Sequence, residues 1–552
     1  MAGEFEQALV ASNSLYRAPR GCLRNRLRFE RWVAELALRL RPDHRARALH
    51  TLRASSVSAW KSWDHEPWRH PWLTAENLRA ARNYSEQVWA LAAEISGRDA
   101  TPHRFAFVGN LANYLYVRAA ALRRQGVDVD IYIHPHDRFV MSQPAWEESD
   151  RELPLDEMDF DRLTEHGFKL SPVEGTYSPD TCTDFGSMIQ SLMNERKPGW
   201  PERFQFARRA DVFRFSDYFC YEPLLRELGR YDALLSAQVP YLAYLANRPY
   251  LTAHTGGEIW VECSRGDLLG HIQRRAFACS NAILASNPWT YAHARRYGFR
   301  NVVYVPFFLD EERYSPGEGK ARPDWEARTG GDFFVLSTAR MDFEDKGSLV
   351  GLEGFARFAN RFPGARLVLL GWGRDLRPVQ TWLGEQGLGD RVLVVRPAAK
   401  RRLIDYLRAS DCLLEQFRIG YFGASALEAM ACGLPVVMRL EGEQYQALCE
   451  TGAPPVLNAA SAEEVATALT TLASSRETRE AASREHRRWF QINHGSGKWA
   501  PVCRDLLIAT ARGHVFSHGR SPLANPISKV EREYHAQALS SAPEFPGQSA
   551  DD

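Results

Sequence analysis

The stretch GYFGASALEAMACGLPVV, residues 420–437, decides the fold of the second half of the chain. It starts with two glycines around a pair of aromatic residues, continues as an apolar helix-like run and ends in a strand-like segment. Gly423 precedes the predicted helix, so the backbone N–H groups near Ala424 and Ser425 can bind phosphate oxygens. Glu428 lies one turn inside this helix, where its carboxylate can accept hydrogen bonds from a ribose diol. The stretch therefore predicts a nucleotide-binding turn between a strand and a helix.

Strands and helices alternate around this stretch. The strand-like segments are FFVLSTAR, ARLVLLGWG, RVLVVRP and DCLLEQF, and the helix-like segments between them are KGSLVGLEGFARFANRFPG, RPVQTWLGEQGLG and LIDYLRAS. Such an alternation is typical of a doubly wound parallel sheet with helices on both faces. It predicts a Rossmann-like domain over residues 313–512.

The same alternation starts earlier in the chain. The apolar run RFAFVGN is followed by the helix-like LANYLYVRAAALRRQG and by a second apolar run, VDVDIYIHP, which together make a βαβ unit. Further strand candidates are YDALLSA, PYLTAHTGG, AILASN and NVVYVPF. We expect a second Rossmann-like domain over residues 101–312, interrupted by a polar insertion at about 138–226. Two such domains in tandem create a cleft between two sheet edges.

The two ends of the chain differ from these domains. Residues 1–100 read as a helical extension, and residues 17–53 hold eleven arginines, three acidic residues and apolar residues at helical spacing. Such a segment can lie on an anionic membrane surface, or its apolar stripe can pack on the main body; both interpretations stay open. Residues 513–552, rich in Ser, Pro and Ala, are expected to be disordered.

Composition excludes several classes of protein. A net charge of +1 over 552 residues argues against a nucleic-acid partner. The nine cysteines lack metal-binding spacing, and no third ligand accompanies His134 and His136, so we expect no metal site. The chain has no apolar stretch of membrane-spanning length and does not start like a signal peptide. These features favour a cytoplasmic protein, held at the inner face of the membrane if the basic segment binds there.

Two cations stand in the loop STARMDFEDKG, residues 337–347. Arg340 lies just past the end of a predicted strand, where open α/β sheets bind ligands. Lys346 follows six residues later, close to the start of the next helix. An arginine, which binds oxygens as a fork, and a lysine, which acts as a compact charge, suit a diphosphate.

Together, this loop and the GYFG…LEAMACGLPVV stretch resemble the donor domain of retaining GT-B glycosyltransferases, especially glycosyltransferase family 4. The family's GR-x-x-x-x-KG-like loop is matched by Arg340, Lys346 and Gly347, and much of its E-x7-E motif by LEAMACGLPVV. The resemblance covers residues 335–472 almost wholly and extends more faintly from about residue 105. It implies a GT-B fold, in which two Rossmann-like doubly wound domains face each other across a cleft, here with a helical N-terminal extension.

The resemblance also implies an activity. The protein would transfer a sugar, with retention of configuration and without a metal or other cofactor, from a nucleoside diphosphate sugar to a glycan or lipid-linked acceptor, in surface polysaccharide or glycoconjugate biosynthesis. Arg340 and Lys346 would bind the pyrophosphate and stabilise the charge that develops as the sugar leaves. Glu428 would hold the ribose hydroxyls. Gly371 and Gly373, in LLGWG, would let the backbone approach the donor.

In the first domain, the resemblance points to the acceptor side. Gly109, Asn110 and Asn113, in VGNLANYLY, would contact the acceptor or a phosphate. The segment PYLTAHTGGEIW resembles a strand that ends in the family's cleft-facing turn, which would point His254 toward the transferred sugar, with Glu258 close by. A purely structural role for His254 is an equal alternative.

A few further residues resemble the family's pattern or depart from it. Arg396 starts a segment that would lie along the nucleobase, and Pro306 and Asp310 resemble the family's hinge-proximal element. One position departs from the pattern, because the first Glu of E-x7-E is replaced by Gly420. Glu415, five residues earlier, is a carboxylate that would have to reach the same place. A non-catalytic scaffold of the same fold and a nucleotide-sugar epimerase are therefore alternative functions.

Overall fold

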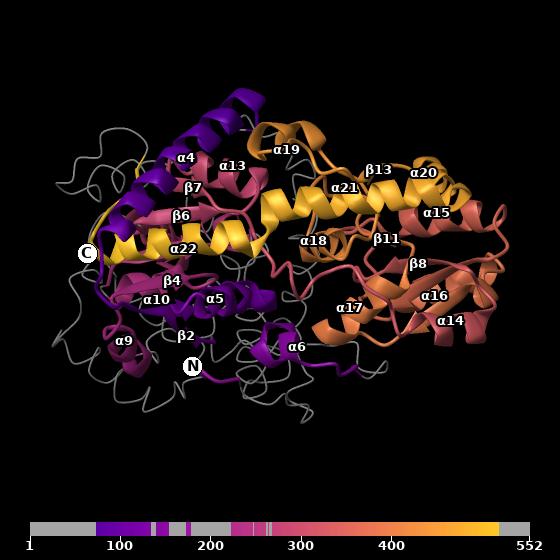
Figure 1. Ribbon diagram of the computed structural model, residues 1–552, viewed down its shortest axis with the longest axis horizontal. Coiled ribbons are helices and arrows are strands. Elements are labelled where there is room, and N and C mark those ends of the chain that lie inside the picture. Colours follow the sequence, from indigo (N-terminus) through magenta and orange to yellow (C-terminus); the bar gives the residue numbers. More distant parts are fainter. Residues whose placement is uncertain are drawn as a thin grey trace, which may run out of the picture.

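The computed structural model describes residues 73–133, 140–153, 173–177, 222–246, 248–254, 256–260, 263 and 268–517. Within them, two parallel sheets flanked by helices lie beside each other along the long axis of the molecule (Figure 1). The expected α/β architecture of two doubly wound domains is confirmed. The basic segment 17–53, the histidines at 134 and 136, most of the insertion and the tail beyond residue 517 lie outside the described residues.

The first sheet has the strand order β3-β2-β1-β4-β5-β6-β7, and its described strands are all parallel. These strands are β1 (Arg104–Val108), β2 (Asp128–Tyr132), β3 (Thr176–Tyr177), β4 (Ala233–Ser236), β5 (Tyr250–Ala253), β6 (Ala282–Ala285) and β7 (Val302–Tyr304). The central strands are apolar runs that are buried on both faces, as expected where helices cover both sides of a parallel sheet. The order reverses between β1 and β4, so the carboxyl ends of these strands border the crevice in which such sheets bind ligands.

Helices surround the first sheet. They are α4 (Ala75–Gly97), η1 (Leu111–Asn113), α5 (Tyr114–Arg124), η2 (Val140–Ser142), α6 (Pro144–Glu148), α9 (Glu222–Leu228), α10 (Pro240–Leu245), α11 (Gly257–Trp260), α12 (Leu268–Cys279) and α13 (Pro288–Arg296). The α4 helix is the described part of the expected N-terminal extension. The indole N–H of Trp89 donates to the carbonyl of Tyr304 (3.1 Å), and the hydroxyl of Ser85 accepts from the backbone N–H of Tyr304 (2.8 Å). This helix is therefore bound to the edge of the sheet at β7.

The second sheet has the strand order β10-β9-β8-β11-β12-β13 and is also parallel. Its strands are β8 (Phe333–Ser337), β9 (Ala365–Leu370), β10 (Val392–Val395), β11 (Cys412–Leu414), β12 (Val436–Met438) and β13 (Leu457–Asn458). Its helices are α14 (Arg322–Thr329), α15 (Ser348–Ala359), α16 (Leu376–Glu385), η5 (Gly389–Arg391), α17 (Lys400–Ala409), α18 (Ala424–Ala431), α19 (Gly442–Leu448) and α20 (Ala462–Ser474). Here the order reverses between β8 and β11, which are the strands that precede the two predicted ligand-binding loops.

The last two helices join the domains. The α21 helix (Arg476–His494) packs on the second domain, and α22 (Ser496–Ala511) returns to the first, against α4, α5, β4 and β5 (Figure 1). The expected division at residue 512 assigns α22 to the second domain, whereas its packing places it on the first. Within the described residues, the backbone thus passes from one domain to the other at two crossings. The crossings are adjacent, because Leu309 N–H donates to His494 O (3.1 Å) and Ser496 N–H donates to Leu309 O (2.9 Å).

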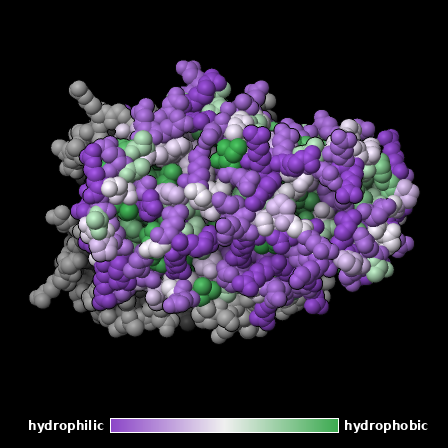
Figure 2. Space-filling view, in the orientation of Figure 1, coloured by the Kyte–Doolittle hydropathy of each residue, from purple (hydrophilic) through white to green (hydrophobic). Residues whose placement is uncertain are grey.

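The face of the molecule drawn in Figure 2 is predominantly polar. Figure 2 shows hydrophilic residues over most of the visible face, with apolar residues scattered in small groups. Among the described helices, none combines the length and apolar character that a membrane span requires.

Candidate functional site

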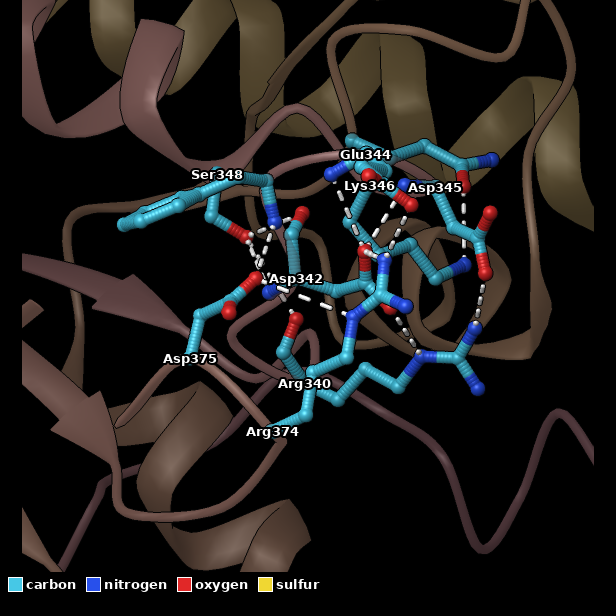
Figure 3. Close-up of polar contacts among 10 residues, drawn as sticks. Arg340, Asp342, Glu344, Asp345, Lys346, Ser348, Arg374 and Asp375 are labelled. Atoms are coloured by element: carbon cyan, nitrogen blue, oxygen red, sulfur yellow. Dashed lines mark hydrogen bonds and ion pairs between the residues drawn. The ribbon is translucent and has the colours of Figure 1, made fainter. Parts of the chain in front are cut away.

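The loop after β8 is organised around the buried carboxylate of Asp342 (Figure 3). Its Oδ1 accepts hydrogen bonds from the backbone N–H of Asp345 (2.7 Å) and from Arg374 Nη2 (2.8 Å). Burial raises the pKa of Asp342, but these bonds outweigh burial and hold the pKa below its usual value. Arg340 contacts Asp345 (3.0 Å) and Asp342 (3.5 Å), yet its side chain stays 44% exposed. Its guanidinium is therefore held in place with donors still accessible to an anion.

Lys346 and Gly347 end this loop where it meets the loop after β11. The Lys346 ammonium donates to the side-chain oxygen of Gln416 (2.8 Å). Burial lowers the pKa of Lys346, although the nearby Glu415 carboxylate opposes this shift. Gly347 has a left-handed backbone (φ +66°), and a Cβ there would lie 3.2 Å from the backbone nitrogen of Arg418. The Lys-Gly pair is therefore fixed by the close approach of the two loops.

The α18 helix begins directly after the loop that follows β11. Gly423, the residue before this helix, has no side chain that could cap it. The backbone N–H groups at Ala424 and Ser425 therefore receive no hydrogen bond from the side chain at the N-cap position. Glu428 lies one turn inside the helix and is 2% exposed. One carboxylate oxygen, Oε1, accepts a hydrogen bond from Lys400, whereas Oε2 has no partner among the described residues. The oxygen Oε2 can accept a hydrogen bond from a hydroxyl group.

Lys400 is shared between carboxylates of both domains. It is the first residue of α17, and Glu147 comes from α6 of the first domain. Burial lowers the pKa of Lys400, but Glu428 and Glu147 outweigh burial and raise it. Burial also raises the pKa of Glu147, which accepts a hydrogen bond from the hydroxyl of Tyr314 (3.2 Å). No motif in the sequence marks Glu147, so sequence reasoning missed this contribution of the first domain.

Glu147 belongs to residues 140–153, which we name the clasp. The clasp extends from the first domain to the segment after β10 in the second. Leu153 N–H donates to Pro397 O (2.7 Å) and Ala399 N–H donates to Arg151 O (2.8 Å), which makes a short antiparallel bridge.

Charged side chains reinforce this bridge. The Glu152 carboxylate accepts hydrogen bonds from the Tyr406 hydroxyl and from Arg402 (3.3 Å), and Glu148 pairs with Arg401 (3.1 Å). The clasp thus covers the segment that was expected to lie along a nucleobase.

The other side of the clasp is held by the glycine loop after β1. Gly109 has a left-handed backbone (φ +85°), in a position where any Cβ would clash with the loop after β4. Asn110 donates to Ser142 O (2.7 Å) and to the side chain of Asn113 (2.7 Å), and Asn113 donates to Gln143 O (2.9 Å). Both asparagines were predicted to contact the acceptor or a phosphate, and in this structure their amides bind the clasp.

His254 lies at the end of β5 and is completely buried. Neither ring nitrogen has a hydrogen-bond partner among the residues that the structure describes, and the ring meets Phe277 edge-on. Burial, with a smaller effect of the Arg118 charge, lowers the pKa of His254 to about 3, so the imidazole is neutral at pH 7. The nearby Glu258 accepts from the backbone N–H of Gly256 (2.9 Å). Within the described ranges, no three His, Cys, Asp or Glu side chains group as metal ligands.

The remaining residues that were predicted to bind the nucleotide-sugar donor follow β9 and β10. Gly371 N–H donates to Val395 O (2.8 Å). Gly373 has a left-handed backbone (φ +109°), and a Cβ there would clash with the backbone of Met341, so this glycine lets the loop pass beside the loop that holds Arg340. Arg396 is exposed at the end of β10.

The two predicted hinge residues lie at the first crossing between the domains. The carbonyl of Pro306 accepts a hydrogen bond from the buried Arg118 (3.0 Å). Asp310 pairs with Arg124 (3.2 Å). Both residues thus connect the crossing to α5, the helix that follows the glycine loop.

Comparison with known proteins identifies the second domain. Residues 322–489 match the family described as Glycosyl transferases group 1. The chain is 29% identical over 157 residues to the mannosylfructose-phosphate synthase of Agrobacterium fabrum, an alignment of 27% of this chain and 35% of that protein. It is 42% identical over 81 residues to a D-inositol 3-phosphate glycosyltransferase of Xylanimonas cellulosilytica, or 14% of this chain and 19% of that protein. The match thus spans about a third or less of the length of these relatives.

Solved structures resemble the chain over both domains. The structure of Anabaena Alr3699/HepE in complex with UDP and glucose has a TM-score of 0.51 at 14% identity, covering 74% of this chain and 100% of that chain. The HepE complex with UDP has a TM-score of 0.50 at 12% identity over the same shares. At this identity the likeness concerns the fold, and the expected GT-B architecture is confirmed. The chain therefore carries a glycosyl transferases group 1 domain, at residues 322–489, within a two-domain GT-B fold.

Proposed function

We propose that the protein is a glycosyltransferase that transfers a sugar from a nucleoside diphosphate sugar to a glycan or lipid-linked acceptor, with retention of configuration and without a metal ion. One arrangement carries this proposal: Arg340 and Lys346 follow β8, and the uncapped start of α18 follows the neighbouring strand β11. Glu428, with one unpaired oxygen, lies one turn inside that helix. The group as a whole suits a nucleoside diphosphate, with phosphates at the cations and helix start and ribose at Glu428.

The same groups account for catalysis. As the bond between sugar and diphosphate breaks, negative charge develops on the diphosphate. Arg340, Lys346 and the positive end of α18 are fixed beside it, so they stabilise the transition state more than the ground state. In the proposed retaining reaction, the leaving phosphate takes the proton of the acceptor hydroxyl on the same face of the sugar. No protein nucleophile is then needed, and His254 is assigned no more than a contact with the sugar.

The similar proteins support a nucleoside diphosphate sugar as the donor and suggest a chemical class for the acceptor. The HepE structures contain UDP, a nucleoside diphosphate, in the same fold. One relative's name denotes transfer to D-inositol 3-phosphate, a small polar acceptor. The assignment to a glycan or lipid-linked acceptor, in polysaccharide or glycoconjugate synthesis at the inner face of the membrane, rests on the family resemblance and on the arginines of residues 17–53.

Ligand-induced stabilisation tests the donor site without a known acceptor. The thermal midpoint is measured with UDP, GDP and ADP and with their glucose and mannose derivatives. One nucleotide series should stabilise the wild type, and Arg340→Ala and Glu428→Ala should lose the effect. Arg357→Ala is the matched control, because this exposed arginine pairs only on the surface with Glu463 (2.8 Å). A wild type that no nucleotide stabilises would favour the scaffold alternative.

Turnover separates the remaining alternatives. With the stabilising donor and a panel of sugar and glycolipid acceptors, NMR of the product should show the same anomeric configuration as the donor. Activity should persist in EDTA. Conversion of the donor sugar with no acceptor present would instead identify an epimerase.

A further inference from the structure

Glu415 is a buried carboxylate in the second domain to which the proposed mechanism gives no role. It follows β11, is 5% exposed, and its Oε2 has no hydrogen-bond partner within the part of the chain that the structure describes. An unpaired carboxylate oxygen inside a protein is unfavourable unless some group donates a hydrogen bond to it. A donor group is therefore expected at Oε2.

The surroundings of Glu415 place it at the edge of the proposed diphosphate site. Burial raises the pKa of Glu415, and the nearby Lys346 ammonium opposes this shift; the same ammonium donates to the next side chain, Gln416 (2.8 Å). On another side, a Cβ added to Gly423 would lie 3.6 Å from Glu415 Oε1, so the carboxylate lies against the residue that precedes α18. In the proposed function, Lys346 and the start of α18 are groups that bind the phosphates.

A second carboxylate, that of Glu441, lies beside Gly420 but already has a partner. A Cβ at Gly420 would clash with the side chain of Glu441, whose backbone N–H donates to Gly420 O (2.7 Å). The space beside Gly420 is thus filled by Glu441, and the Glu441 carboxylate pairs with Arg439 (3.2 Å). Of the two carboxylates, Glu415 is the one with an unpaired buried oxygen.

We propose that Glu415 accepts a hydrogen bond from a hydroxyl of the sugar on the diphosphate, and so selects nucleotides that carry a sugar. This inference rests on the function proposed above. The oxygen Oε2 can accept a hydrogen bond, so a sugar hydroxyl next to the second phosphate satisfies it. A third phosphate in the same place would bring two negative charges together. Affinity should therefore fall from the nucleotide sugar to the nucleoside diphosphate and again to the triphosphate.

Calorimetry on wild type and Glu415→Gln tests this order. The ligands are UDP, UTP, UDP-glucose, UDP-galactose and UDP-N-acetylglucosamine, and the matching GDP and ADP series. In the recognised series, the wild type should bind one sugar form at least about 10-fold more tightly than the diphosphate, as expected for a hydrogen bond to a buried charge. Glu415→Gln should lose most of this preference, should bind the triphosphate more tightly, and should keep its affinity for the diphosphate.

Two controls make the result decisive. Glu441→Gln should keep the wild-type order, and its loss of the sugar preference would overturn the assignment to Glu415. Glu415→Asp keeps the charge but shortens the side chain, so it should weaken sugar binding and still disfavour the triphosphate. Unchanged ratios of sugar form and triphosphate to diphosphate in Glu415→Gln would refute the inference while diphosphate binding upholds the proposed function. A wild type that binds no diphosphate would refute both.

Discussion

The indole ring of Trp289 in the first domain stacks on the phenol ring of Tyr421 in the second, with ring centroids 5.3 Å apart and planes inclined by 25°. Trp289 lies in the first turn of α13, and Tyr421 lies in the GYFG turn that leads into α18. The turn that presents backbone N–H groups to the proposed phosphates is therefore in contact with the opposite domain. Donor binding and the relative position of the domains should be coupled through this ring pair.

Replacement of Trp289 tests this coupling. We expect Trp289→Ala to weaken nucleoside diphosphate binding by about 2- to 10-fold, because a stacked aromatic pair contributes roughly 0.5–1.5 kcal/mol beyond its buried area. Trp289→Phe should retain most of the affinity. Titration calorimetry with the stabilising diphosphate measures both, and wild-type affinity in Trp289→Ala would show that the stack does not support the turn.

Arg340 should matter more for turnover than for folding. Its side chain is 44% exposed, so Arg340→Ala should leave the thermal midpoint of the unliganded protein nearly unchanged. The rate constant kcat should fall by about 100- to 1,000-fold, as when one donor to a developing negative charge is removed. Initial rates with the recognised donor measure this loss. Arg357→Ala provides the comparison, and an equal loss there would point to a general effect on the domain.

His486 should make stability depend on pH in the acidic range. Its Nε2 accepts a hydrogen bond from Val436 N–H (3.1 Å), and its Nδ1 contacts the Ala482 carbonyl (2.7 Å), which together require the neutral imidazole. Burial lowers its pKa from 6.5 to about 4. Between these values the unfolded chain binds the proton and the folded chain does not, so the free energy of unfolding falls as the pH falls from 6.5 to 4. The slope contributed is at most about 1.4 kcal/mol per pH unit.

The variant His486→Gln isolates this effect. The glutamine amide can make equivalent hydrogen bonds but does not titrate. Urea unfolding at pH 4.5, 5.5, 6.5 and 7.5 should show a smaller loss of stability toward acid in the variant than in the wild type. Parallel pH dependences in the two proteins would contradict the assignment of this proton to His486.

The clasp should be tied to the second domain by Glu152. Removing this carboxylate in Glu152→Ala leaves Tyr406 and Arg402 without their shared partner. Since a hydrogen bond to a charged group contributes about 1.5–3 kcal/mol, amide exchange in residues 140–153 should accelerate by about 10-fold or more. Hydrogen-exchange mass spectrometry measures the rate. Glu463→Ala, which removes an exposed ion pair, should leave exchange in the clasp unchanged.

Candidate site residues could be predicted from the sequence where they lie in the loop or helix that directly follows one strand. Arg340, Lys346 and Gly423 follow strands with strong apolar runs, and the carboxyl ends of neighbouring parallel strands meet at one edge of the sheet. Glu428 lies within a turn of Gly423, so helical geometry alone fixes its distance from the start of α18. The fold and the proposed donor half of the site could thus be predicted without coordinates.

Contacts between distant segments were not predictable in this way. Glu147 approaches Lys400 from more than two hundred residues away in the chain, in a segment with no repeating pattern. The side chains of Asn110 and Asn113 lie in the expected loop, but their partners are backbone carbonyls of the clasp, and backbone carbonyls carry no sequence signal. The path of α22 back to the first domain likewise depends on packing rather than on the period of its apolar residues.

The two adjacent crossings have a consequence for how this protein can be altered. Because the backbone of Leu309 is hydrogen-bonded to that of both His494 and Ser496, the whole second sheet is inserted between two points that almost touch. A segment with this geometry can be exchanged as a cassette, by joining a homologous donor half at the same two points without stretching the host. Under the proposed function, a chimera built in this way would combine the diphosphate-binding loops of the inserted half with the clasp and the acceptor side of the half that receives it.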